Sequence, residues 1–166
     1  MVYPANLAAC IIFIFIQTKI NCYFWRSSHQ TLTMSKQTIL WADDDEDDLM
    51  MMREVLEQID QSYEIVEVYN GKEAINYLQR RKQNNGSFPC LVIMDINMPV
   101  MNGKEALVQI KSDEDLKAIP VVIFTTSKST MDQLFCQHYG VTMISKPPDF
   151  ETLRAEVKKL IDFCKQ

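Results

Sequence analysis

The stretch Cys90-Leu91-Val92-Ile93-Met94-Asp95 decides the fold class of this chain. Five apolar residues in a row favour a strand that is covered on both faces, and such strands lie at the centre of parallel sheets. This strand ends at a carboxylate, Asp95. Because ligands bind beyond the carboxyl ends of the strands in open parallel sheets, the stretch predicts a central strand that delivers an acid to the functional edge.

Four further apolar stretches flank this strand, two on each side: residues 38–42, 64–68, 121–124 and 141–145. Between and after them, apolar residues recur at helical spacing. The predicted helices begin near Asp47-Asp48, after Asn70-Gly71, at Lys104, at Ser129 and at Asp149. Alternation of five strands with five helices predicts an α/β fold, a doubly wound parallel sheet with helices on both faces.

Chemically useful side chains follow four of the predicted strands. Asp43 and Asp44 follow the first, Asp95 the third, Thr125 the fourth and Lys146 the fifth. Converging carboxylates repel one another unless a cation lies between them. Ligands that are oxygen atoms alone favour a hard cation, Mg²⁺ first and Mn²⁺ second. A cation, an ammonium and a hydroxyl around one carboxylate suit the stabilisation of a transferring phosphoryl group.

Composition excludes several other classes of protein. The net charge is −5, and no cluster of Lys and Arg occurs, which argues against nucleic acid as a partner. The four glycines form neither of the common phosphate-binding loops. The five cysteines are scattered, without a CxxC pair and without nearby paired histidines. A zinc site and a disulfide framework are therefore not expected, and reduced thiols are the preferred interpretation.

Residues 1–33 form a separate segment with only two charged side chains, Lys19 and Arg26. Its continuous apolar run, residues 8–16, would rise only about 13 Å as a helix, too little to span a bilayer. A signal peptide would need basic residues before the run and small residues after it. The preferred interpretation is that translation starts at Met34 and that residues 1–33 are an annotation extension or disordered; a membrane or export role is the alternative.

Four motifs occur in order: Asp43-Asp44, Met94-Asp95-Ile96-Asn97-Met98-Pro99 with Asn102-Gly103, Thr125-Thr126, and Lys146-Pro147. Together they resemble the receiver domains of two-component response regulators, of the chemotaxis-regulator type. The resemblance covers about residues 37–165, and we assign the domain to residues 34–166. It implies a flavodoxin-like fold with strand order 2-1-3-4-5.

The resemblance also implies a role for each matching residue. Asp95 would be the phosphoacceptor, and Mg²⁺ would be bound by Asp43, Asp44, Asp95 and the backbone carbonyl of Asn97. Lys146 would pair with one phosphoryl oxygen and Thr125 would hydrogen-bond another. The Lys146-Pro147 peptide would be cis.

Two residues depart from the family pattern. Met143 stands where the family usually has Tyr or Phe, and Thr126 replaces the commoner Ala or Ser. Both keep an alternative open, a pseudo-receiver that binds proteins without accepting phosphate. A metal-dependent phosphatase is a weaker alternative, because the usual Asp-x-Asp pair is absent after the third strand, where Ile96-Asn97 follows Asp95.

We therefore expect a stand-alone, cytoplasmic phosphorylation switch rather than an enzyme. By the same resemblance, the phosphoryl donor would be a histidine kinase or a histidine phosphotransfer protein. The output would be altered binding of an unidentified protein through about residues 129–163, with no nucleic acid and no membrane span involved.

Overall fold

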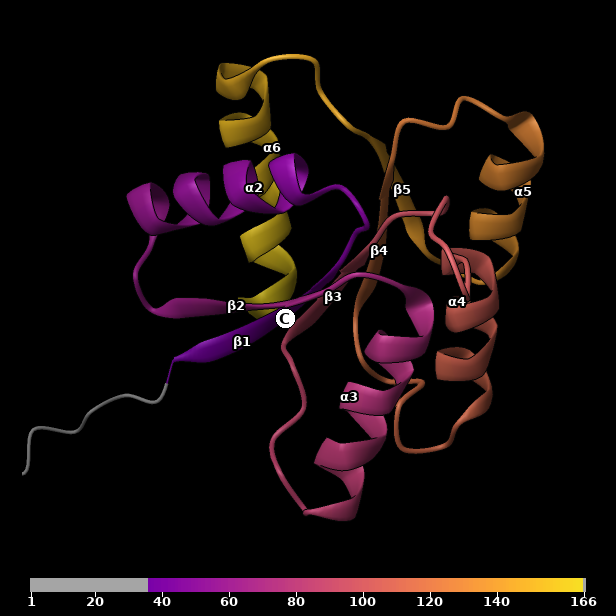
Figure 1. Cartoon of the computed structure of the whole chain (residues 1–166). Coiled ribbons are helices and arrows are strands. Elements are labelled where there is room, and N and C mark those ends of the chain that lie inside the picture. The colour runs from indigo at the N-terminus through magenta and orange to yellow at the C-terminus, as the bar shows by residue number, and fades with distance from the viewer. Residues whose placement is uncertain (1–35, 166) are drawn as a thin grey trace, which may run out of the picture. The chain divides into compact units, whose positions relative to one another are not determined.

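The computed structural model describes residues 36–165. Five parallel strands form one sheet in the order β2-β1-β3-β4-β5, which confirms the predicted fold class and strand order (Figure 1). The strands are β1 (Gln37–Ala42), β2 (Tyr63–Val68), β3 (Leu91–Met94), β4 (Val121–Thr125) and β5 (Thr142–Ser145). The helices are α2 (Glu46–Ile59), α3 (Gly71–Gln83), α4 (Gly103–Ser112), α5 (Thr130–His138), α6 (Phe150–Asp162) and the short 3₁₀ helix η1 (Phe163–Lys165).

The central strand β3 is buried along its whole length, as its apolar run predicts. It pairs with β1 on one side, where Ile93 lies opposite Trp41, and with β4 on the other, where Ile93 lies opposite Val122. A strand with a neighbour on each edge and helices on each face has no side chain in contact with solvent, which explains why no polar residue interrupts the run.

Helices cover both faces of the sheet (Figure 1). On one side, α2 and α6 pack together over a cluster that includes Trp41, Leu56 and Val157. On the other side, α3, α4 and α5 cover a second cluster that includes Leu40, Leu78 and Leu107. Because successive strand residues point to opposite faces, neighbours such as Leu40 and Trp41 serve different clusters.

Polar side chains fix the helix starts close to where the sequence predicts them. Asn102 forms a capping box with Glu105 at α4, and Asp149 caps α6. The prediction for α2 needs a correction: Asp45 is the cap, and its carboxylate accepts hydrogen bonds from the N–H groups of Asp47 and Asp48. Ser129 precedes α5 but makes no capping hydrogen bond with its side chain.

Gly103 allows α4 to start directly against the functional edge of the sheet. A Cβ atom at this position would lie 2.1 Å from the backbone oxygen of Asp95, a distance that no side chain tolerates. The Gly103 N–H donates a hydrogen bond to the carbonyl of Ile96. The residue is therefore needed to let the loop after β3 fold closely around Asp95.

Val100 lies in the same loop with a positive φ of 65° and an exposed side chain. This backbone region costs an L-residue roughly 1–2 kcal/mol, and most for a β-branched side chain. We therefore predict that Val100→Asn raises the free energy of unfolding by about 1 kcal/mol, measured by urea denaturation. Val100→Thr keeps the β-branch and serves as the control. A gain of equal size in both variants would contradict the explanation.

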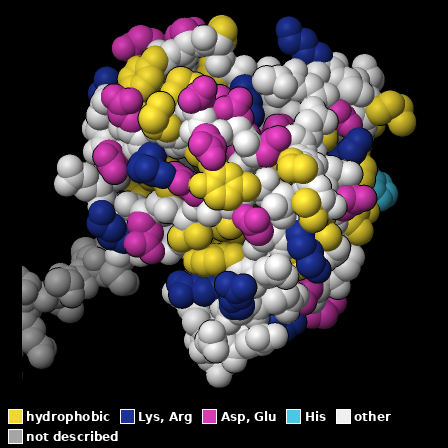
Figure 2. Space-filling view, viewed as in Figure 1, with side chains coloured by type: hydrophobic (Ala, Val, Ile, Leu, Met, Phe, Trp, Pro, Cys, Tyr) yellow, Lys and Arg dark blue, Asp and Glu magenta, His cyan; other side chains and the backbone are white. Residues whose placement is uncertain are grey.

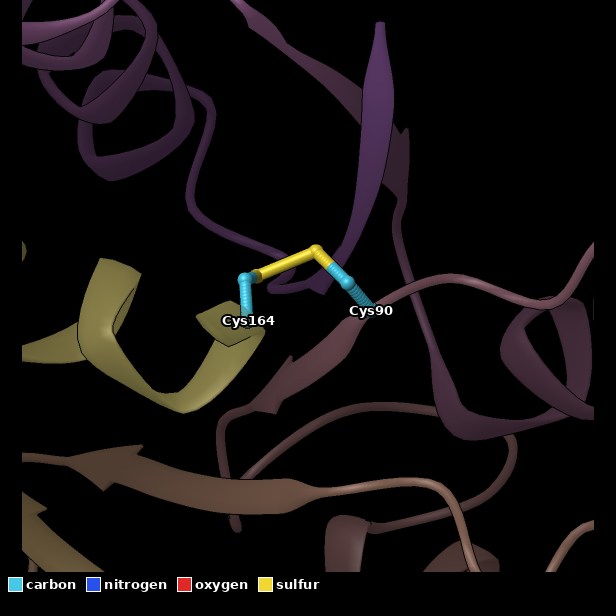
Figure 3. The surroundings of a disulfide bond; sticks show 2 residues. All are labelled: Cys90 and Cys164. Atoms are coloured by element: carbon cyan, nitrogen blue, oxygen red, sulfur yellow. A yellow bond between two sulfur atoms is a disulfide. The ribbon is translucent and has the colours of Figure 1, made fainter. Parts of the chain in front are cut away.

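Cys90 and Cys164 form a disulfide bond, which corrects the prediction of reduced thiols for this pair (Figure 3). Their Cα atoms are 4.8 Å apart, although 74 residues separate them in the sequence. The bond joins the residue before β3 to the 3₁₀ helix after α6. Spacing along the chain could not show this pair, because the packing of α6 brings the two residues together. Cys136 is a free, buried thiol.

The predictions for residues 1–33, including a start at Met34, lie outside the described residues. Among residues 36–165, no helix is long and apolar enough to cross a membrane. On the face of the molecule shown in Figure 2, basic side chains are interspersed with acidic ones, without a broad basic patch.

Candidate functional site

The carboxylates of Asp43, Asp44 and Asp95 form one cluster at the carboxyl ends of β1 and β3. One oxygen from each residue lies within 4.8 Å of the others. Backbone hydrogen bonds produce this arrangement: the Asp43 N–H donates to Val68 and the Asp95 N–H donates to Ala42, so that both aspartates extend the strand ladders. The prediction that these three acids converge is therefore confirmed.

The three carboxylates differ in their exposure. Asp43 and Asp95 are buried, whereas Asp44 is exposed. The indole N–H of Trp41 and the backbone N–H of Asp45 both donate to the Asp43 carboxylate, at 3.4 and 3.2 Å. Burial raises the pKa of Asp43, and its hydrogen bond with Lys146 only partly offsets this. The cluster thus has two sheltered acids and one acid that faces solvent.

Lys146 provides the positive charge of the site. Its Nζ lies 2.7 Å from Asp43 Oδ2 and 3.6 Å from Asp95 Oδ2, and its side chain is only 9% exposed. Burial alone would lower its pKa, but hydrogen bonds with Asp43 and Asp48 and the charge of Asp95 raise the pKa well above the ordinary value for lysine. Lys146 therefore stays charged over the whole physiological pH range.

The Lys146-Pro147 peptide is trans, since the described residues contain no cis peptide bond. The predicted cis peptide is therefore wrong in this structure. Trans is the more stable form of an X-Pro bond by about 0.5–1 kcal/mol, and the long lysine side chain brings its ammonium to the carboxylates without the cis form. The backbone N–H of Lys146 donates to the Thr125 carbonyl, which aligns the ends of β4 and β5.

Thr125 is fully buried at the end of β4. Its hydroxyl oxygen accepts a hydrogen bond from the Ser127 N–H at 3.2 Å. Asp95 instead accepts a hydrogen bond from the Ile96 N–H, at 2.6 Å. Thr125 thus ends the strand that pairs with β3, and its hydroxyl is engaged within its own loop.

The remaining candidate residues differ in their exposure. Asn97 is exposed in the loop after Asp95, and Thr126 is exposed beside Thr125. Met143 is half-buried on β5 and packs against the cluster beneath α3, α4 and α5. The position that usually holds an aromatic ring is therefore filled from the edge strand by an aliphatic side chain.

Asp48 belongs to the site, although the sequence assigned it only to the start of a helix. Its Oδ2 lies 2.6 Å from Lys146 Nζ, and its side chain is 27% exposed. The two residues are 98 positions apart. No spacing rule connects a residue in the first turn of α2 with the end of β5, so the contact could be found only from the structure.

The donor set fits a hard divalent cation. Three carboxylates and no cysteine or histidine make up the cluster, and the exposed Asp44 leaves it open to solvent. Such oxygen ligands suit Mg²⁺ or Mn²⁺. The ammonium of Lys146 also lies next to both buried carboxylates, Asp43 and Asp95. The fold and the site together define a receiver-type domain, whose acidic cluster lies at the carboxyl edge of a doubly wound sheet.

Comparison with known proteins supports this class. The family described as response regulator receiver domain matches residues 39–158. The probable methanogenesis regulatory protein FilR2 of Methanothrix harundinacea is 33% identical over 127 residues, which cover 75% of this chain and 81% of that protein. The response regulator Rcp1 of a Synechocystis species is 35% identical over 97 residues, 58% of this chain and 66% of that protein.

Solved structures show the same similarity. The crystal structure of the phosphorylated cyanobacterial phytochrome response regulator RcpA superposes with a TM-score of 0.71 at 33% identity and covers 79% of this chain and 95% of that one. The Mn²⁺-bound form of Rcp1 gives a TM-score of 0.68 at 30% identity, and the match covers 76% of this chain and 93% of that one. The chain belongs to the response regulator receiver domain family of two-component signalling.

Proposed function

We propose that the protein is a phosphorylation switch in which Asp95 accepts a phosphoryl group from a phosphohistidine. The observation that carries this proposal is that the Asp95 carboxylate clusters with those of Asp43 and Asp44 and lies 3.6 Å from the ammonium of Lys146. A buried carboxylate with an adjacent cation site and a fixed ammonium is suited to attack on phosphorus and to charge neutralisation afterwards.

In the proposed reaction, an Asp95 carboxylate oxygen forms a bond to phosphorus while the bond from phosphorus to the histidine nitrogen breaks. The histidine leaves with the electron pair of that bond and takes up a proton. Hydrolysis reverses the modification, since water adds to phosphorus and Asp95 leaves as a free carboxylate with inorganic phosphate as the other product. Mg²⁺, bound by Asp43, Asp44, Asp95 and the Asn97 carbonyl, would neutralise phosphoryl charge. The Mn²⁺-bound form of a similar protein supports this choice of cation.

Lys146 and Thr125 would recognise the attached group. The ammonium of Lys146 is already 3.6 Å from Asp95 and needs only a small movement to contact a phosphoryl oxygen. The hydroxyl of Thr125 must turn from Ser127 toward the pocket, which would shift the loop between β4 and α5. This shift is the event that a partner would detect.

The output would be read on α5, β5 and α6, within residues 129–163. Met131 and Leu134 are large exposed apolar side chains on α5. A surface pocket between α5 and β5 is bordered by Ser127, Met143 and Ser145, so that it adjoins the loop that follows Thr125. These features support a protein partner, and the upstream donor would be a histidine kinase or a histidine phosphotransfer protein.

We predict that the wild-type protein gains one phosphoryl group when incubated with Mg²⁺ and acetyl phosphate or phosphoramidate, as measured by intact mass. Asp95→Asn removes the nucleophilic oxygen but keeps the shape of the side chain, so the gain is abolished. Asp113→Asn, which alters an ion-paired acid remote from the pocket, should leave the gain intact. A wild-type protein that gains no mass would instead support the pseudo-receiver alternative, and repeated turnover of phosphomonoesters would support a phosphatase.

A further inference from the structure

Lys146 makes its shortest contact with a residue outside the carboxylate cluster. Its Nζ is 2.6 Å from Asp48, 2.7 Å from Asp43 and 3.6 Å from Asp95. The first two distances are those of charge-assisted hydrogen bonds, whereas the third is an ionic contact without a hydrogen bond. In this arrangement, the ammonium is therefore held by two acids and only approaches the phosphoacceptor.

The two acids that hold the ammonium differ in their other interactions. Asp43 is completely buried, accepts two further hydrogen bonds and belongs to the cluster that suits a cation. The carboxylate of Asp48 hydrogen-bonds to Lys146 and is partly open to water. Water can therefore replace the ammonium at Asp48 at low cost, while the same exchange at Asp43 would leave a buried charge unpaired.

We propose that Asp48 is a positioning residue, which holds Lys146 in a resting position and competes with the phosphoryl group on Asp95 for its ammonium. This inference rests on the proposed function. The backbone of Asp48 is fixed by a hydrogen bond from its N–H to the Asp45 carboxylate, so the competing acid stands at a defined place in the first turn of α2. The strength of the competition sets how readily the pocket accepts a phosphoryl group.

The test uses the full-length protein with Mg²⁺ and beryllofluoride, which mimics an attached phosphoryl group. Trp41 donates to Asp43 and so reports on the pocket by fluorescence in a Trp25→Phe background. Asp48→Asn keeps the side-chain shape but removes the charge, and it should tighten beryllofluoride binding about fivefold. Asp47→Asn is the matched control, since Asp47 is an exposed acid in the same helical turn. It should change binding less than about twofold.

A double-variant cycle separates competition for Lys146 from a general charge effect. In a Lys146→Gln background, Asp48→Asn should no longer tighten binding. An equal gain with and without Lys146, an equal gain in Asp47→Asn, or unchanged or weaker binding in Asp48→Asn would each overturn the proposal.

A measurement without phosphoryl mimic or metal separates this proposal from the proposed function. The ¹⁵N resonance of the Lys146 ammonium should shift in Asp48→Asn and stay in place in Asp47→Asn. If the resonance shifts in Asp48→Asn but the wild-type protein binds no beryllofluoride, the proposed function and the inference that rests on it are both overturned. A wild-type protein that binds beryllofluoride without any effect of Asp48→Asn would overturn the inference alone.

Discussion

Replacement of Lys146 by methionine is expected to lower the free energy of unfolding of the EDTA-treated protein by about 3 kcal/mol at neutral pH. The methionine fills a similar volume but leaves the fully buried Asp43 without its cation. Removing one partner of a buried ion pair costs this much because the remaining charge has lost both its solvent and its counter-ion. Urea denaturation of the two proteins measures the difference.

The loss of folding stability in Lys146→Met should depend on pH, and the raised pKa of Asp43 sets the direction of this dependence. The folded pKa of Asp43 is already raised, so protonation of this carboxyl favours the folded state, and its contribution to stability falls as pH rises through the folded pKa. Without Lys146 the pKa of Asp43 rises further. The stability that the protonated carboxyl provides is then lost over a range that extends to higher pH. The destabilisation should therefore shrink as the pH is lowered from neutrality toward the ordinary range of aspartate. A constant difference across this range would contradict the assigned role of Asp43.

Lys82→Met is the control for the Lys146 variant. Lys82 also contacts two acids, Asp113 and Asp115, but at the surface. Solvent screens that pair of contacts, so the loss of stability should be clearly smaller than for Lys146 and should not depend on Asp43. Addition of Mg²⁺ should stabilise all three proteins, because each retains the acid cluster. It should stabilise the Lys146 variant most and so narrow its difference from the wild type, because there the cation would also replace the missing charge.

Reduction of the Cys90–Cys164 disulfide is expected to lower the free energy of unfolding by about 4 kcal/mol. The bond closes a long loop, since 74 residues separate the two cysteines. Its removal gives the unfolded chain more conformational freedom, and that entropy is the main source of the loss in the chain-entropy account. The comparison is urea denaturation of the wild-type protein with and without a thiol reductant.

Two variants assign this effect to the correct pair of cysteines. Cys164→Ser should unfold like the reduced wild-type protein and should not respond to the reductant. A protein in which both Cys10 and Cys22 are serine should keep the full response. Equal stability of the oxidised and reduced wild-type proteins would show that the bond does not constrain the unfolded chain as expected.

Much of the fold and of the site could be predicted, because the central strand and the acids at the strand ends are visible as short patterns in the sequence. The apolar run that ends at Asp95 requires a strand covered on both faces, and parallel strands direct their carboxyl ends to one edge. The positions of Asp43, Asp44, Asp95 and Lys146 at strand ends therefore sufficed to predict that these side chains cluster. Their functional roles remain proposals that the experiments above test.

Other features depended on contacts between distant segments, and the sequence could not reveal them. Asp48 reads as a residue in the acidic first turn of a helix, and only the packing of α2 beside the end of β5 makes it a partner of Lys146. Cys90 and Cys164 become neighbours through the docking of α6. The peptide at Lys146-Pro147 is trans rather than cis, and the ammonium of Lys146 still lies 2.7 Å from Asp43.

The central claim, that this pocket captures a phosphoryl group on Asp95, is tested most directly by a crystal structure with Mg²⁺ and beryllofluoride. We predict density for beryllofluoride joined to an Asp95 carboxylate oxygen, with the ammonium of Lys146 in hydrogen-bond contact with a fluorine atom. Asp43 and Asp44 should contact the cation. A pocket that contains neither group, with Lys146 still held by Asp43 and Asp48, would contradict the claim.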